Sequence, residues 1–204
     1  MPSLEDLELD LSAPVEIPHQ FEIELNSTVV VNHKLIVDAI DRDEDAELEK
    51  LSFEDDEWAR SIGSQIQNSY DDFRRAANNQ AAVALVTRVQ HWIARFAKRV
   101  PVAPKSKSKG SLLVSDLGHL NVFLGEGPVP VSFFAELVNV RDSVIHGDSK
   151  AEWDFEGKRR YVAAEYASVY LETEISNEQL SVAIAKAIEQ VTWYDIKLQT
   201  AGRF

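Results

Sequence analysis

The run EWARSIGSQIQNSYDDFRRAANNQAAVALVTRVQHWIARFAKR, residues 57–99, carries a long periodic pattern that decides the expected fold. Its apolar residues recur at steps of three or four, as on one face of an α-helix. The pattern predicts a helix from Glu57 to Ala76, a break at Ala76-Ala77-Asn78-Asn79, and a second helix from Gln80 to Arg99. Because the predicted connection is short, the two helices are expected to be antiparallel neighbours.

The chain before this run divides into three predicted parts. Residues 1–20 combine acidic residues with three prolines and are expected to form a loosely held acidic arm. The domain proper is then expected to span residues 21–204. Its first helix is predicted to end near Ile40, and the acidic segment from Asp41 to Glu57 is expected to be a solvated helix start or loop.

The chain after the run predicts three further helices and one hairpin. SLLVSDLGHLNVFLG, residues 111–125, indicates a short helix. Ser132 is expected to cap a helix from Phe133 to about Val144, with Gly147 as its stop. Residues 152–174 are rich in aromatic and β-branched residues and indicate a small β-hairpin. The final helix is expected to be capped by Ser176 or Asn177, and its apolar face to consist of Leu180, Ile184, Ile188, Val191 and Ile196.

These elements together predict a mainly all-α protein, an antiparallel helical bundle with a small β-hairpin before its last helix. The chain has 204 residues and no cysteine, which excludes disulfides and thiolate metal sites. No apolar run approaches the roughly 20 residues that a membrane helix needs. The N-terminus lacks the basic region of a secretory signal. We therefore expect a soluble, cytoplasmic protein with no membrane partner.

The formal net charge of −13 repels nucleic acid at long range and argues against duplex binding through a broad basic face. A small basic site remains compatible with RNA. The clearest candidate is the basic loop, residues 98–111, in which Lys105, Lys107 and Lys109 follow Lys98 and Arg99. This loop is either a flexible soluble connection or a phosphate-attracting flap, in which case its three spaced lysines would contact RNA.

Neither metal nor organic cofactor chemistry is indicated by the sequence. The five histidines show no ligand spacing such as His-x3-His. Runs of carboxylates such as DRDED are typical of solvated surface. Glycine-rich phosphate loops and the GxSxG nucleophile motif are absent from the sequence. We expect neither a metal site nor a cofactor.

The stretch VNVRDSVIHGDSK, residues 138–150, places Arg141, Asp142 and His146 within six residues. Histidine can accept or donate a proton near neutral pH, and the arginine fork can stabilise charge on a phosphate. Arg141 and His146 are five residues apart, which is about 140° around an ideal helix, so they converge only if the helix ends between them or the arginine wraps around it. Asp142 and His146 share a face and can interact, so Asp142 could orient the imidazole.

The spacing alone carries little information in a chain with 11 arginines and five histidines. An alternative interpretation is that Arg141 pairs with an acid, Asp142 or Asp148, while His146 caps the C-terminus of its helix. The context is more specific: the motif ends an apolar helix, a polar residue follows the arginine, and a glycine follows the histidine.

In this context the chain resembles the HEPN superfamily of small helical nucleotide-binding and RNase domains. The signature of that family is Arg-x4-6-His with a polar residue after the arginine, here RDSVIHG, and the helix order fits from about Leu25 to Gln199. The resemblance implies a HEPN-type bundle and metal-independent RNA cleavage, with Arg141 stabilising the phosphorane, His146 transferring protons and Asp142 orienting His146. It also implies a homodimer that brings two motifs into one cleft.

The resemblance leaves the function open between two classes. The first is an endoribonuclease, with a toxin or an antiviral effector as candidate roles and RNA as its partner. The second is a non-catalytic dimerisation or protein-binding module, for which the acidic segments suggest a basic partner. A protein regulator is a further open alternative. Some toxin members of the family carry a tyrosine two residues after the histidine as the target of a modifying antitoxin; Asp148 stands there in this chain, which does not support that control.

Overall fold

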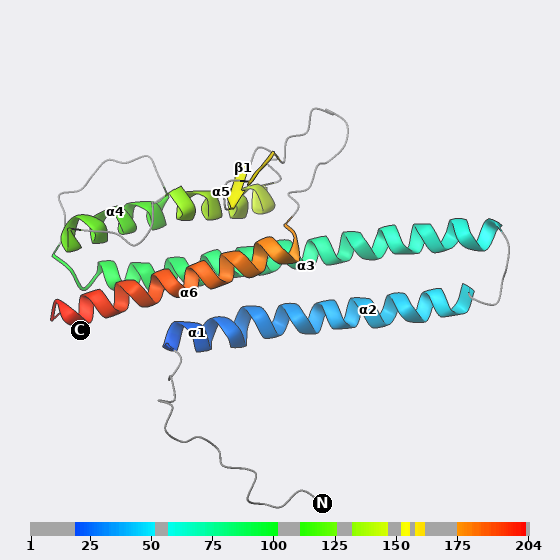
Figure 1. Cartoon of the computed structure of the whole chain (residues 1–204), viewed down its shortest axis with the longest axis horizontal. Coiled ribbons are helices and arrows are strands. Elements are labelled where there is room, and N and C mark those ends of the chain that lie inside the picture. Colours follow the sequence, from blue (N-terminus) through cyan, green and yellow to red (C-terminus); the bar gives the residue numbers. More distant parts are fainter. Residues whose placement is uncertain are drawn as a thin grey trace, which may run out of the picture.

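The computed structural model describes residues 19–51, 57–101, 111–125, 132–146, 152–155, 158–161 and 175–202, and this part of the chain is mostly helical (Figure 1). The expected mainly all-α class is confirmed. Most of the N-terminal segment 1–20 and of the basic loop lie outside the described residues. Gly147 and residues 162–174 of the predicted hairpin region lie outside them as well. Within them, no helix is both long and apolar enough to cross a membrane.

The first helix is continuous from Gln20 to Leu51 and comprises α1 (Gln20–Leu25), the π-helical turn η2 (Asn26–Val30) and α2 (Val31–Leu51). The prediction that it ends near Ile40 is therefore wrong. The acidic residues beyond Ile40 do not unwind the helix because Asp41 and Glu44 both pair with Arg74 of the neighbouring helix. Glu, Leu, Ala and Lys, which dominate its last two turns, are also strong helix formers.

Residues 57–97 form a single 41-residue helix, α3 (Glu57–Ala97). The predicted break at Ala76-Ala77-Asn78-Asn79, and with it the predicted antiparallel pair, is wrong. Asn78 is buried, and its amide is fully engaged: Nδ2 donates to the carbonyl of Ile175 (2.8 Å), and Oδ1 lies 2.6 Å from Nε2 of His33. An asparagine favours turns mainly by bonding to its own local backbone. Here tertiary partners occupy the side chain, so the helix continues.

Three predicted helices are present after α3. They are α4 (Leu112–Leu124), α5 (Ser132–His146) and α6 (Asn177–Thr200). The Ser111 hydroxyl caps α4 by accepting from the Val114 amide at 3.3 Å. Helix α5 already includes Ser132, the residue that we expected as its cap. Of the two caps proposed for α6, Ser176 is the one used, in a reciprocal capping box with Gln179.

The apolar face predicted for α6 is only partly correct. Leu180 and Val191 are buried, and Ile184 and Ile188 pack against the core from its edge, but Ile196 is 54% exposed. The buried face instead continues through Tyr194 and Leu198. Tyr194 donates its hydroxyl to Oδ1 of Asn121 on α4 (2.5 Å), which satisfies a polar group in the core.

Two short strands follow α5 within the region for which we predicted a hairpin. They are β1 (Glu152–Phe155) and β2 (Lys158–Tyr161), paired antiparallel with Glu152 opposite Tyr161. Each strand has only four residues, so the protein remains mainly α-helical.

The core surrounds the C-terminal half of α3. In Figure 1, α6 lies along one side of this half, with α4 and α5 along another. Trp92 joins α1 to α3 by edge contacts with His19, Phe21 and Phe96, at centroid distances of 5.5 to 5.8 Å. Most of the largest fully buried side chains come from α1, α3, α4, α5 and α6: Phe21, Leu25, Leu85, Ile93, Phe96, Leu113, Leu117, Leu120, Phe134, Leu137 and Tyr194.

The other half of α3 pairs with α2 alone and extends past the ends of α4, α5 and α6 (Figure 1). We call this pair, α2 with residues 57–76 of α3, the arm. No residue of α2 is buried, and Ala59 is the one buried residue among residues 57–76. The ion pairs described between its two helices are those of Arg74 with Asp41 and Glu44. With so few buried residues, the arm is a projection rather than part of the core.

Because Asn78 joins α2, α3 and the start of α6, its replacement should destabilise the fold. Asn78→Ala leaves the buried carbonyl of Ile175 without its partner, and an unsatisfied buried group costs about 1–3 kcal/mol. Asn79→Ala is the matched control, because Asn79 is also buried but its Oδ1 has no described hydrogen-bond partner. Urea unfolding should show a loss of about 2 kcal/mol for Asn78→Ala and little for Asn79→Ala. Equal losses would contradict this role of Asn78.

Candidate functional site

Arg141 lies on α5, and its guanidinium is held from two sides. Nη1 donates to Oε1 of Gln90 on α3 (2.9 Å). Nε and Nη2 both donate to Oδ1 of Asp142, at 2.8 and 2.6 Å. The arginine side chain is 21% exposed and that of Asp142 46%. These contacts fix the direction of the guanidinium while leaving part of it open to solvent.

Arg141 lines an open groove of about 620 Å³ where α3, α4 and α5 meet. Gln90 comes from α3, and the first residues of α4 and its cap form a second wall. The polar lining residues are Gln90, Ser111, Asn139, Arg141 and Asp142, and the apolar ones are Leu112, Val114, Ala135 and Val138. An open groove of this size, with a few converging polar groups, has the general form of a ligand site.

His146 is the last residue of α5, and its side chain lies outside the described residues. The helix does not end between Arg141 and His146, which was one condition for their convergence in one chain. On this continuous helix the two positions are about 140° apart. Asp142 occupies the position one turn before His146, but the partner that the structure describes for it is Arg141.

The three lysines predicted to contact RNA, Lys105, Lys107 and Lys109, also lie outside the described residues. The segment that carries them is covalently joined to Ser111, which lines the groove. Of the two basic residues that precede it, Lys98 is exposed, and Arg99 lies 3.7 Å from Oδ1 of Asp195 and over the ring of Phe96. The structure therefore leaves the RNA-binding role of this loop as a prediction.

Of the residues that line the groove, only Arg141 and Asp142 were predicted as site residues, and the polar residues Gln90 and Asn139 were among those missed. Gln90 interrupts the apolar pattern of α3 between Val89 and His91, and a lone amide within such a run is the signal that could have drawn attention to it. Its contact with Arg141 joins residues 51 positions apart, which no local pattern reveals. Among the described residues, no three His, Cys, Asp or Glu side chains are grouped so as to hold a metal ion.

Comparison with known protein families, with curated proteins and with solved structures found no match to this chain.

Proposed function

We propose that this chain is a metal-independent endoribonuclease whose site is the groove at Arg141, completed by His146. The observation that carries the proposal is the state of the Arg141 guanidinium. A guanidinium has five N–H donors, and three of them make the described bonds to Gln90 and Asp142. No described residue accepts from the other two, which we assign to a phosphate in the groove. An oriented arginine of this kind can stabilise the charge that develops on a phosphorane.

The proposed chemistry is an internal transfer within the RNA. A histidine base removes the proton of the 2′-hydroxyl, and the 2′-oxygen attacks the adjacent phosphorus. The bond between phosphorus and the 5′-oxygen breaks, and that oxygen takes a proton from a general acid. The products are a 2′,3′-cyclic phosphate and a 5′-hydroxyl. His146 suits the proton transfers because the pKa of histidine is normally near neutrality.

A second copy of the chain forms part of this proposal. The reaction needs a base, an acid and a charge stabiliser around one phosphate, and continuous α5 separates Arg141 from His146 by about 140°. A symmetric dimer would bring two copies of the motif together, so that the Arg141 of one chain and the His146 of the other can face the same phosphate. Asp142 then keeps Arg141 oriented and lies one helical turn from the His146 of its own chain.

The direct test is cleavage of single-stranded RNA in EDTA, with analysis of the new ends. We expect cyclic phosphate ends and a loss of rate of about 100-fold or more in both Arg141→Ala and His146→Ala. The Arg141–Asp142 pair is partly exposed, so its loss should change stability by less than about 1 kcal/mol. Arg60→Ala, an exposed arginine on the arm, is the control and should keep full activity. Undiminished cleavage by both site variants would rule out this function.

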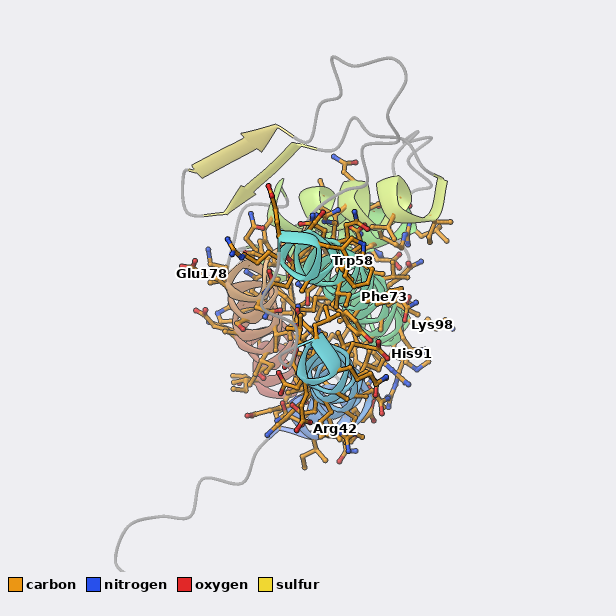
Figure 2. All side chains as sticks on the ribbon, turned by 90° about the vertical axis from the view of Figure 1, so that its right-hand side faces the viewer. Arg42, Trp58, Phe73, His91, Lys98 and Glu178 are labelled. Atoms are coloured by element: carbon orange, nitrogen blue, oxygen red, sulfur yellow. The ribbon has the colours of Figure 1, made fainter. Side chains whose placement is uncertain are left out.

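The alternative function, a non-catalytic protein-binding module, is favoured by the surface of the arm. Trp58 and Phe73 on α3 are 59% and 55% exposed, and Val31, Leu35 and Ile36 on α2 are also exposed. Figure 2 shows Trp58 and Phe73 on the same side of α3. Fifteen residues, or about 22 Å of helix, separate them, and exposed aromatic side chains are typical of protein interfaces. The seven carboxylates of α2, against three Lys and Arg, suit a basic partner.

This alternative predicts that a basic partner protein co-purifies with the chain and is lost from the double variant Trp58→Ser/Phe73→Ser. The substitutions should not unfold the chain, since both side chains are mostly exposed. Val122→Ser is the control, because Val122 is 81% exposed but lies on α4, and it should retain the partner. Equal retention by both variants would show that the arm is not the binding surface.

A further inference from the structure

The positive charge of this acidic chain is concentrated in one stretch. Residues 73–115 contain nine Lys and Arg and neither Asp nor Glu, although the whole chain has 34 acidic residues. One face of α3 carries Arg88, His91 and Arg95 at steps of three or four residues, and Lys98 follows three residues later in the turn after the helix. Figure 2 shows His91 and Lys98 on the same side of the molecule.

A second hollow lies on this face, away from the groove at Arg141. It has a volume of about 370 Å³ and is lined by Thr28 of η2 and by Ala84, Thr87, Arg88 and His91 of α3. Gln90, which lines the groove, is two residues from Arg88 and about 200° from it around the helix. The two hollows therefore open on different sides of α3.

The lining of this hollow suits an anion. Arg88 makes no ion pair with any described residue, and His91 is exposed. The hydroxyls of Thr28 and Thr87 donate to the carbonyls of Glu24 (2.6 Å) and Val83 (2.8 Å). A hydroxyl proton can rotate, so each can turn to an incoming oxygen.

The turn that presents Thr28 departs from regular α-helix. The hydroxyls of Ser27 and Thr28 both donate to the carbonyl of Glu24, and such bonds bend helices. Five residues there form the π-helical turn η2. Isolated π-helical turns occur frequently at functional sites.

The carboxylate of Glu24 lies in the field of Arg88 and Arg95 and acts against an anion here. Oε2 of Glu24 accepts from Nε1 of Trp92 at 2.9 Å. That bond, with the positive field of Arg95 and Arg88, lowers the pKa of Glu24, although partial burial opposes the shift. Arg95 stacks over the Trp92 ring, 4.6 Å from its centroid. Glu24 therefore keeps its negative charge and is already engaged by Trp92 and by the two arginines.

From this arrangement we propose that the hollow at Thr28, Thr87, Arg88 and His91 is a binding site for a phosphoryl group. Arg88 binds the phosphoryl oxygens through its planar fork, and His91 and the two hydroxyls complete the site. The phosphoryl group belongs either to a small phosphorylated ligand, which the volume admits, or to an RNA backbone. This site does not depend on the proposed cleavage at Arg141.

The test is isothermal titration with two probes, pyrophosphate and a 2′-O-methyl RNA oligonucleotide, which lacks the attacking hydroxyl. Arg88→Gln should weaken binding by about tenfold or more, as expected for the loss of a charged hydrogen bond. Glu24→Gln should tighten binding, since it removes the opposing charge and keeps an acceptor for Trp92. Arg60→Gln makes the same change of charge on an exposed residue of the same helix, and its affinity should stay within about twofold of the wild type.

The pattern across probes identifies the source of the phosphoryl group. Binding of pyrophosphate that requires Arg88 assigns the site to a small phosphorylated ligand. Binding of RNA alone that requires Arg88 assigns it to a nucleic-acid backbone. The proposal is overturned if neither probe binds at millimolar concentration, or if Arg88→Gln and Arg60→Gln weaken binding equally.

Discussion

The structure depends on the continuity of α3 through Asn78. This buried amide bonds to His33 on α2 and to the carbonyl just before α6, so it aligns three helices at the point where α3 passes from the core into the arm. A break there would separate the two halves of α3, and the orientation of one half would no longer fix that of the other. Because the helix continues, the arm is joined rigidly to the core half of α3, on which Arg88 lines the second hollow and Gln90 lines the groove at Arg141.

Helical periodicity predicted α4, α5 and α6 because their apolar faces pack on a single core and their ends carry local signals, such as Ser176 before α6. It did not predict the continuity of α3, since Ala-Ala-Asn-Asn favours a turn by local preference and only contacts 45 and 97 residues away satisfy Asn78. A distant contact also explains why the first helix does not end near Ile40 as predicted. The acidic segment after Ile40 stays helical because its Asp41 and Glu44 pair with Arg74 of α3. Ile196 fits the apolar pattern of α6 but lies beyond the surface that the other helices cover.

The candidate site, too, could be predicted from the sequence only in part. The types of Arg141, Asp142 and His146, and their place at the end of an apolar helix, were visible in the sequence. The groove was not, because Gln90 meets Arg141 only after α3 and α5 pack. The contact between Arg141 and Gln90 also bears on whether Arg141 and His146 can meet within one chain. Arg141 is held toward Gln90 and Asp142, and its backbone position lies about 140° around an unbroken helix from that of His146. The proposed function therefore places the arginine of one chain and the histidine of another at the same phosphate.

The most direct measurement of that claim is the activity of a heterodimer of two inactive chains. Arg141→Ala and His146→Ala chains with different tags would be co-expressed and the mixed dimer isolated through both tags. If one chain supplies the arginine and the other the histidine, the mixed dimer keeps one intact site and should show about half the RNA cleavage of a wild-type dimer. A mixed dimer as inactive as its two parents would contradict the account.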